Sequence, residues 1–248
     1  MSSSIVVYLL PVVYSVALPL GLLIWWKRKT GVRLWCFIAG AICFTLFAML
    51  LEQIFHTVLL LGDNAFSNAV KGSAIAYTLY ASLSAGLFEE TGRLFGYKIF
   101  LKNHREKECA VAYGIGHGGM EVCLILGMTY LIYLLAKCGI PIGDAQTTAG
   151  IINTADSIPI GIVCIAMFER LSAMLTHLGL SMAVFPAARQ KGRLWLYPAA
   201  ILMHAFADAP AALYQYGIIT SIRLIEGAAF ITGLVYLIAG IKLLGTYE

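Results

Sequence analysis

Residues 5–26 read IVVYLLPVVYSVALPLGLLIWW, an apolar run without a charged side chain. The hydrocarbon core of a bilayer is about 30 Å thick and is crossed by roughly 20 apolar residues in a helix. The residues before this run lack the basic segment that is typical of a cleavable signal peptide. We therefore predict that residues 5–26 form the first of several membrane-spanning helices.

The composition of the whole chain agrees with this interpretation. Of its 248 residues, 60% are hydrophobic and only 12% are charged, and the mean hydropathy is +0.84. A soluble domain carries roughly 25% charged residues, so this chain has too few to cover a surface in water. We expect the lipid bilayer as its solvent and, with a net charge of only +4, no nucleic-acid partner.

Six further runs are long and apolar enough to span. Together the seven runs cover residues 5–26, 34–61, 73–98, 109–136, 157–186, 194–215 and 221–245. They predict an all-α fold, a polytopic transmembrane bundle of about seven helices, with residues 1–248 forming a single integral membrane domain.

The basic residues lie in alternate connections. One set of connections holds Lys27, Arg28, Lys29, Arg33, Lys98, Lys102, Arg105, Lys107, Arg189, Lys191 and Arg193, whereas the other set offers Lys71, Lys137 and Arg223. Because cytoplasmic loops are enriched in Lys and Arg, we predict an N-terminus outside and a C-terminus in the cytoplasm. We expect a multi-pass protein of a bacterial plasma membrane.

The cysteines show no metal-binding spacing. They are Cys36, Cys43, Cys109, Cys123, Cys138 and Cys164, and no two of them form a CxxC pair. They lie in or beside apolar runs, so we predict small buried side chains rather than disulfides or zinc ligands.

Many ionisable residues lie inside the predicted spans. They are Glu52, His56, Glu89, Glu90, Arg93, His117, Glu121, Glu169, Arg170, His177, His204, Asp208 and Glu226. Such groups cost several kcal/mol in a bilayer unless they are paired or face a wet cavity, so each one suggests a functional site.

Depth separates these residues into two groups. At a rise of 1.5 Å per residue, Glu89, His117, His177 and His204 lie roughly 12–18 Å from the inner ends of their helices. We expect the four to meet at one level, within a core of motif-bearing helices at 73–215. We place Glu52, His56, Glu169 and Glu226 nearer the outer side and outside the cluster, as contacts between helices or paired charges.

Helical spacing indicates how the clustered residues are oriented. His117 and Glu121 are four residues apart, as are His204 and Asp208, so each pair shares a helix face. The neighbouring Glu89 and Glu90 point about 100° apart, which lets one react while the other binds a neighbour.

Two further features accompany the cluster. Arg93 lies four residues after Glu89 and is expected to hold that carboxylate ionised and in place. The glycines around His117, which are Gly114, Gly116, Gly118 and Gly119, leave room for close helix approach or for the backbone of a substrate.

The motifs occur in a recognisable order: EExxR at 89–93, GHGGxE at 116–121, His177, and HxxxD at 204–208. This order resembles the YhfC family of intramembrane proteases, which is related to PrsW-type proteases and more remotely to the CaaX-processing family. The resemblance covers roughly residues 73–215.

The resemblance implies an intramembrane endopeptidase that hydrolyses a peptide or membrane-protein substrate with an activated water. Carried over, Glu89 or Glu90 is the general base with His117 as its partner. Arg93 orients the glutamates, and His204 with Asp208 polarises the carbonyl or binds metal. The chain departs from the CaaX-type pattern in having Asp208 in place of an asparagine.

Two enzyme mechanisms fit these residues, and two other functions compete with them. His117, Glu121, His177 and His204 are the candidate ligands of a zinc ion, which lowers the pKa of its water to about 7. A glutamate alone could instead activate the water. An ion- or proton-coupled transporter would use the same buried groups, and an inactive family member would retain only the cavity.

Overall fold

The computed structural model describes residues 5–62 and 64–247, and the regular structure of these residues is helical. The helices are α1 (Ile5–Thr30), α2 (Leu34–Phe44), η1 (Thr45–Glu52), α3 (Gln53–Leu60), α4 (Ala65–Lys71), α5 (Ala74–Phe95), η2 (Gly96–Phe100), α6 (Lys107–Glu121), η3 (Val122–Gly127), α7 (Met128–Lys137), α8 (Ala145–Ser157), α9 (Ile160–Arg189), α10 (Leu196–Gln215) and α11 (Ile222–Gly245). The η segments are π-helical and continue the α-helices before them. The predicted all-α fold is confirmed.

Six segments of the described chain are long and apolar enough to cross a membrane. They are Ile5–Thr30, Leu34–Leu60, Lys107–Lys137, Ile160–Arg189, Leu196–Gln215 and Ile222–Gly245. The expected span at 73–98 is also helical, as α5 and η2, but it falls outside this set because Glu89, Glu90 and Arg93 make it less apolar. Its polar side must therefore face protein, and α5 packs mainly against α10.

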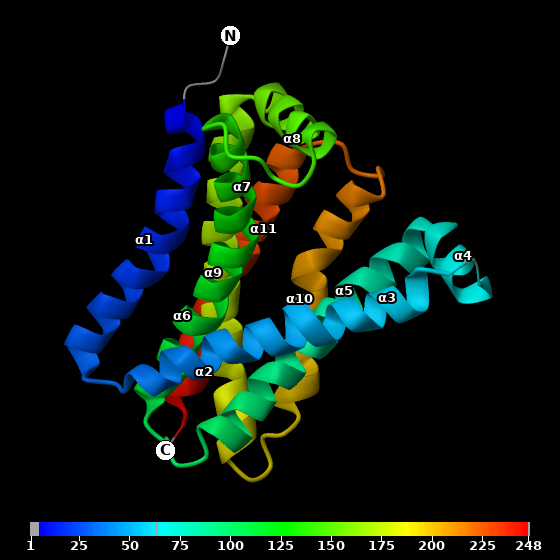
Figure 1. The fold of residues 1–248 in the computed structure, drawn as a ribbon. Coiled ribbons are helices and arrows are strands. Elements are labelled where there is room, and N and C mark those ends of the chain that lie inside the picture. The colour runs from blue at the N-terminus through cyan, green and yellow to red at the C-terminus, as the bar shows by residue number, and fades with distance from the viewer. Residues whose placement is uncertain (1–4, 63, 248) are drawn as a thin grey trace.

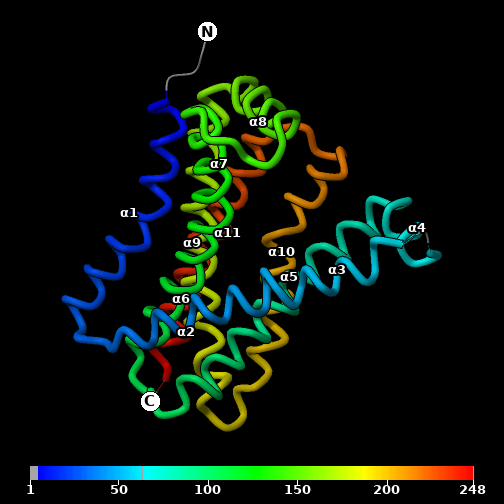
Figure 2. Tube along the Cα trace, viewed as in Figure 1, coloured from blue at the N-terminus to red at the C-terminus, as the bar shows by residue number. Residues whose placement is uncertain are grey.

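Helix α9 lies at the centre of the bundle. It packs most extensively against α11 and also contacts α6, α10, α5 and α1. The segment formed by α2, η1 and α3 crosses the face of the bundle that is turned to the viewer (Figure 1). The same views place α8 and the N-terminal end of α1 at one end of the molecule and the C-terminal end of α11 at the other (Figures 1 and 2).

Glycines bring the backbones of α2 and α6 into direct contact. A Cβ atom on Gly116 would overlap the carbonyl oxygen of Phe37, and one on Gly40 would lie 2.8 Å from the backbone nitrogen of His117. Only glycine permits so close an approach. This contact packs α6 directly against α2 and leaves His117 0% exposed. The predicted close approach of helices at these glycines is confirmed.

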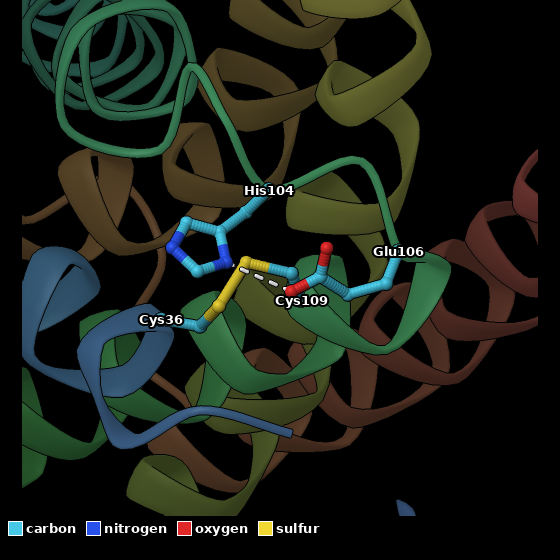
Figure 3. Close-up of side chains that lie close together, drawn as sticks. All are labelled: Cys36, His104, Glu106 and Cys109. Atoms are coloured by element: carbon cyan, nitrogen blue, oxygen red, sulfur yellow. Dashed lines mark hydrogen bonds and ion pairs between the residues drawn. A yellow bond between two sulfur atoms is a disulfide. The ribbon is translucent and has the colours of Figure 1, made fainter. Parts of the chain in front are cut away.

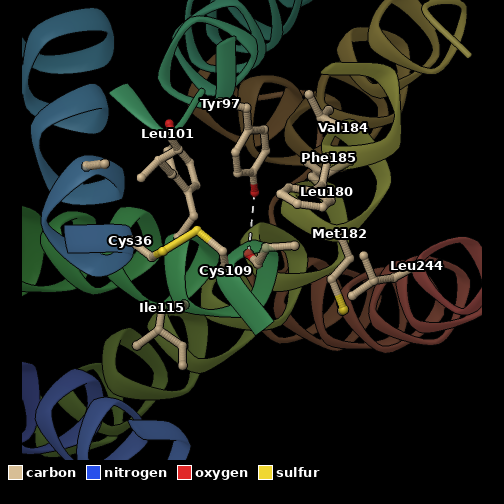
Figure 4. Packing of buried hydrophobic residues seen from close by; sticks show 14 of the residues in the cluster. Cys36, Tyr97, Leu101, Cys109, Ile115, Leu180, Met182, Val184, Phe185 and Leu244 are labelled. Atoms are coloured by element: carbon tan, nitrogen blue, oxygen red, sulfur yellow. Dashed lines mark hydrogen bonds between the residues drawn. A yellow bond between two sulfur atoms is a disulfide. The ribbon is translucent and has the colours of Figure 1, made fainter. Parts of the chain in front are cut away.

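The cysteine prediction was wrong for four of the six cysteines, since two form a disulfide and two are exposed. Cys36 and Cys109 form a disulfide whose Cα atoms are 5.5 Å apart, within a cluster of buried apolar residues that includes Tyr97, Leu101 and Phe185 (Figure 4). The two cysteines are 73 residues apart in sequence, so only the packing of α2 on α6 reveals the pair. Of the free cysteines, Cys43 is buried, Cys123 is half-buried, and Cys138 and Cys164 are exposed.

The long polar connection at 138–156 is largely helical. Its helix α8 begins after Asp144, whose side chain accepts a hydrogen bond from the backbone nitrogen of Thr147 at 2.7 Å. Lys137 at the end of α7 donates to Asp156 at 2.7 Å. A capped and paired amphipathic helix thus covers this end of the bundle.

Candidate active site

Four neighbouring helices deliver acids and bases to one place. Glu89, Glu90 and Arg93 come from α5, His117 and Glu121 from α6, Arg170 and His177 from α9, and His204 and Asp208 from α10. All of these side chains except Asp208 are buried. Since α9 contacts α5, α6 and α10, the helices surround one polar centre.

Glu89 lies among three imidazoles. Its Oε2 atom is 2.9 Å from Nε2 of His117 and 3.8 Å from Nδ1 of His177, and its Oε1 atom is 3.8 Å from Nε2 of His204. Glu89 therefore lies close to all three histidines that depth counting placed at its level. Glu89 is 8% exposed and lines a cavity, so its carboxylate can meet water.

Glu90 points the other way and has a different role. Its Oε2 atom lies 2.9 Å from Nε of Arg93, and both side chains are 0% exposed. The expectation that Arg93 holds Glu89 was wrong, because the guanidinium turns toward the residue three positions earlier. Arg93 also donates to the carbonyl of His177 at 3.0 Å and to the hydroxyl of Ser181. The ion pair thereby ties α5 to α9.

His177 is held by a second carboxylate. Its Nε2 atom contacts Glu121, which also accepts a hydrogen bond from Arg170 at 2.6 Å. Because an ionised carboxylate can only accept, Nε2 of His177 carries the proton and Nδ1 presents a lone pair. Nδ1 faces Glu89 at 3.8 Å and Arg93 at 3.2 Å. Glu121 thus orients His177 and not His117, its neighbour on α6.

His204 is oriented in the same manner by Glu90. Its Nδ1 atom donates to Glu90 at 2.8 Å, which fixes the orientation of the ring. Nε2 lies 3.4 Å from Asp208 on the next turn of α10 and 3.8 Å from Glu89. The chain from Arg93 through Glu90 to His204 therefore fixes a basic nitrogen at the edge of the cavity.

The cavity has a volume of about 130 Å³, enough for several water molecules. Its polar lining consists of Glu89, Glu121, Glu169, Arg170, Ser172, Thr176, His177, His204, Asp208 and Glu226. The expectation that Glu169 and Glu226 stay apart from the cluster was wrong. Depth counting treats helices as straight and perpendicular to the membrane, whereas long helices tilt.

Glu52 and His56 form a contact beside this centre. The expectation that Glu52 stays outside the cluster was wrong, because it interacts electrostatically with Glu89, His204 and Asp208. His56 bonds Glu52 at 3.2 Å and the hydroxyl of Tyr80 at 2.8 Å, which joins α3 to α5. This arrangement agrees with the interpretation of the pair as a contact between helices.

The polar centre offers a suitable donor set for a metal ion. Among the described residues, Glu89, His117 and His177 present ligand atoms that all lie within 4.8 Å of one another. Two imidazoles and one carboxylate are a known ligand set of catalytic zinc. Glu121 would then support His177 from behind, as carboxylates do for metal-bound histidines. A cation at Nδ1 of His177 would replace the contact with Arg93.

Sequence reasoning missed two contributors to the site. Arg170 was not placed in the cluster, but it binds Glu121 as well as Glu169 and lines the cavity. Helix α11 carries no motif, yet Ile225, Glu226 and Ala229 complete the wall. The charges of Arg170 and Glu226 inside predicted spans were the available signal. Spacing along one helix, however, does not show which neighbouring helix a charged residue faces.

Comparison with known proteins agrees with the geometry. The family described as YhfC intramembrane metalloprotease matches residues 14–229. The chain belongs to the YhfC family. A Bacillus subtilis (strain 168) protein named "Uncharacterized membrane protein YhfC" is 34% identical over 235 residues, which cover 91% of this chain and 88% of that protein. No solved structure matches.

Family membership settles the class of molecule. This YhfC-family chain is a multi-pass integral membrane protein with six strongly apolar spans in its described residues. The resemblance seen in the order of motifs is confirmed, while kinship with PrsW and CaaX-type proteases stays a prediction.

Proposed function

We propose that the protein is an intramembrane endopeptidase that hydrolyses a peptide bond at the cavity beside Glu89. One observation supports this most directly: a carboxylate at a water-sized cavity lies 2.9–3.8 Å from three histidines contributed by three other helices. Structural pairing alone would not require so many costly groups at one point.

The donor set defines where a metal would be held. Glu89, His117 and His177 would bind it, and when bound it would supply Lewis-acid polarisation of the carbonyl and favour ionisation of water. Glu121 and Arg170 keep His177 in the required tautomer and orientation.

His204 is the proposed proton carrier. Its Nε2 atom accepts a proton from the attacking water as the water oxygen adds to the peptide carbonyl. The same nitrogen then returns the proton to the leaving amine, and the C–N bond breaks. Glu90 stabilises the imidazolium that forms, since its carboxylate already accepts from Nδ1 at 2.8 Å.

Asp208 and the cavity wall position the substrate. Asp208 lies 3.4 Å from Nε2 of His204 and is placed to orient the water that His204 deprotonates. Since the site lies inside the bundle, the substrate segment that contains the scissile bond must adopt an extended conformation before it can enter. We infer a peptide or a membrane-protein segment as the substrate.

The test begins in cells and ends with purified protein. New peptide termini in the membrane proteome are compared between cells that express wild type and cells that express Glu89→Ala. A substrate found in this way is then incubated with purified protein in water enriched in oxygen-18. Hydrolysis places one heavy oxygen in the new carboxylate.

The expected loss for Glu89→Ala or His204→Ala is about 100-fold or more. Asp156→Asn, which alters an exposed carboxylate on α8, serves as the control. Folded Glu89→Ala protein that cleaves the substrate at the wild-type rate would refute the proposal.

A further inference from the structure

A second cluster of metal-ligating side chains lies at the end of the bundle that carries the basic loop 98–107. Cys36, His104, Glu106 and Cys109 present two sulfurs, an imidazole and a carboxylate within 4.8 Å of one another (Figure 3). Cys36 comes from the first turn of α2 and Cys109 from the first turn of α6, while His104 and Glu106 lie in the loop before α6. None of them lines the active-site cavity.

We propose that, when the Cys36–Cys109 disulfide is reduced, these four residues bind one zinc ion. Zinc prefers thiolate and imidazole ligands in a closed tetrahedral site and also accepts a carboxylate. Magnesium and calcium prefer oxygen ligands throughout. The site is independent of the proposed protease activity, since it shares no residue with it.

The redox step balances with a dithiol reductant. The reductant transfers two electrons and two protons, the S–S bond breaks, two cysteine thiols form, and the reductant becomes a disulfide. Zinc binding then forms two S–Zn bonds and releases both thiol protons to solvent. The basic loop 98–107 is predicted to face the cytoplasm, where thiols are kept reduced.

Both cysteines occupy the same favourable position in their helices. Cys36 is the third residue of α2 after Arg33, and Cys109 is the third residue of α6 after Glu106. The positive end of a helix dipole stabilises a thiolate in this position. Both are 0% exposed, whereas the side chains of His104 and Glu106 are 12% and 38% exposed. An ion can therefore enter from the loop side.

The loop that carries two of the ligands, and the helix ends on either side of it, are held from three helices. Trp26 of α1 donates to the carbonyl of Glu108 at 2.9 Å, and Trp35 of α2 donates to that of Phe100 at 3.1 Å. Arg189 of α9 donates to the carbonyls of Leu101 and His104, the latter at 2.9 Å. His104 also bonds Glu106 at 2.8 Å. This support fixes the ligands before an ion arrives.

Cobalt is a probe that distinguishes this site from the polar centre around Glu89. A thiolate bound to Co²⁺ gives a ligand-to-metal charge-transfer absorption, which the sulfur-free set Glu89, His117 and His177 cannot produce. The full-length protein is reduced in detergent, its thiols are counted, and it is titrated with Co²⁺ and then with Zn²⁺. We expect the absorption to appear and one equivalent of zinc to abolish it.

Variants assign the signal to the four residues. Cys36→Ser should lose the absorption, and His104→Asn should weaken cobalt affinity by about 10-fold or more. Cys43→Ser is the matched control, since Cys43 is also buried in α2 but belongs to no such cluster, and it should keep the absorption. If Cys36→Ser does not fold, His104→Asn decides alone.

Three results would overturn the proposal. The first is reduced wild-type protein that gives no charge-transfer absorption. The second is a wild-type signal in Cys36→Ser or unchanged cobalt affinity in His104→Asn. The third is a disulfide that a dithiol cannot reduce in the folded protein, because the ligands would then never be available.

Discussion

The polar cluster around Glu89 and the cluster around Cys36 both gather acids and bases, but they are built differently. The cluster around Glu89, here called the inner cluster, uses nitrogen and oxygen donors from four helices beside a cavity. The cluster around Cys36, here called the end cluster, uses two buried sulfurs and a loop that is held by hydrogen bonds from Arg189. Open sites with a free position suit catalysis, whereas closed sulfur-rich sites suit structure. In the functions proposed here, reactivity and stability are separated by depth and by donor type.

The two clusters also neutralise charge in different ways. Arg93 and Glu90 pair without any exposure to solvent. At the end of the bundle, the half-buried side chain of Arg189 donates hydrogen bonds to backbone carbonyls, which are neutral partners. Loss of a partner is therefore far more costly inside the bundle.

The largest expected effect concerns catalysis at the inner cluster. Glu89→Ala should lower peptide hydrolysis by about 100-fold or more while the protein stays folded, because the carboxylate lies at the cavity and not in the Arg93 pair. Oxygen-18 incorporation into product measures this loss. Cys36→Ser offers the opposing test: if the folded variant lost hydrolysis as fully as Glu89→Ala, the separation of the two clusters would be wrong.

The next effect concerns stability. Arg93→Met should destabilise the fold by about 3–5 kcal/mol, because it leaves the carboxylate of Glu90 buried without its partner. Arg189→Met should cost less, about 1–3 kcal/mol, since it leaves neutral carbonyls and not a buried charge without a partner. Unfolding in mixed detergent micelles compares the two.

A double variant separates charge from packing at Arg93. Adding Glu90→Gln to Arg93→Met should recover part of the lost stability, since the unpaired charge is removed. A double variant no more stable than the single one would show that packing, not charge, dominates at this position.

A smaller effect tests the backbone contact beside His117. Gly116→Ala should cost about 1–3 kcal/mol, because the added methyl group overlaps the carbonyl of Phe37. Gly21→Ala is the matched control, since a Cβ there meets nothing within 4 Å. Thermal unfolding should separate them, and equal midpoints would contradict the close contact of α2 and α6.

The smallest effect lies outside both clusters, at the exposed cap of α8. The hydrogen bond from the backbone of Thr147 lowers the pKa of Asp144. The stabilisation of α8 by this hydrogen bond is therefore fully present above the pKa of Asp144 in the unfolded state, about 3.9. It is lost as pH falls through the lower pKa of the folded state.

Hydrogen exchange of α8 amides should reveal this change. After correction for the intrinsic pH dependence of amide exchange, we expect lower protection factors below pH ~4 than at neutral pH. Asp144→Asn keeps a good cap that does not titrate, so its exchange should lack this acid-induced step. An acid step that persists in Asp144→Asn would assign it to another group.

The helix periodicity made part of the inner cluster predictable. Spacing of four residues correctly placed His204 beside Asp208, and the 100° offset between Glu89 and Glu90 correctly separated a cavity-facing carboxylate from a paired one. Spacing predicted the wrong partner for Arg93, which pairs with Glu90. It also failed for Glu121, which contacts His177 on another helix. Periodicity fixes the face of a residue but not the partner that the face meets.

The amino-acid sequence alone determined the solvent, the helical class and the helices that bear the chemistry, because apolar length and charge depend only on the local order of residues. The tertiary structure decided which polar groups pair, that α11 closes the cavity, and that Cys36 meets Cys109. These contacts depend on the tilt and rotation of packed helices, which arise from interactions between distant segments and leave no periodic signal in any one of them.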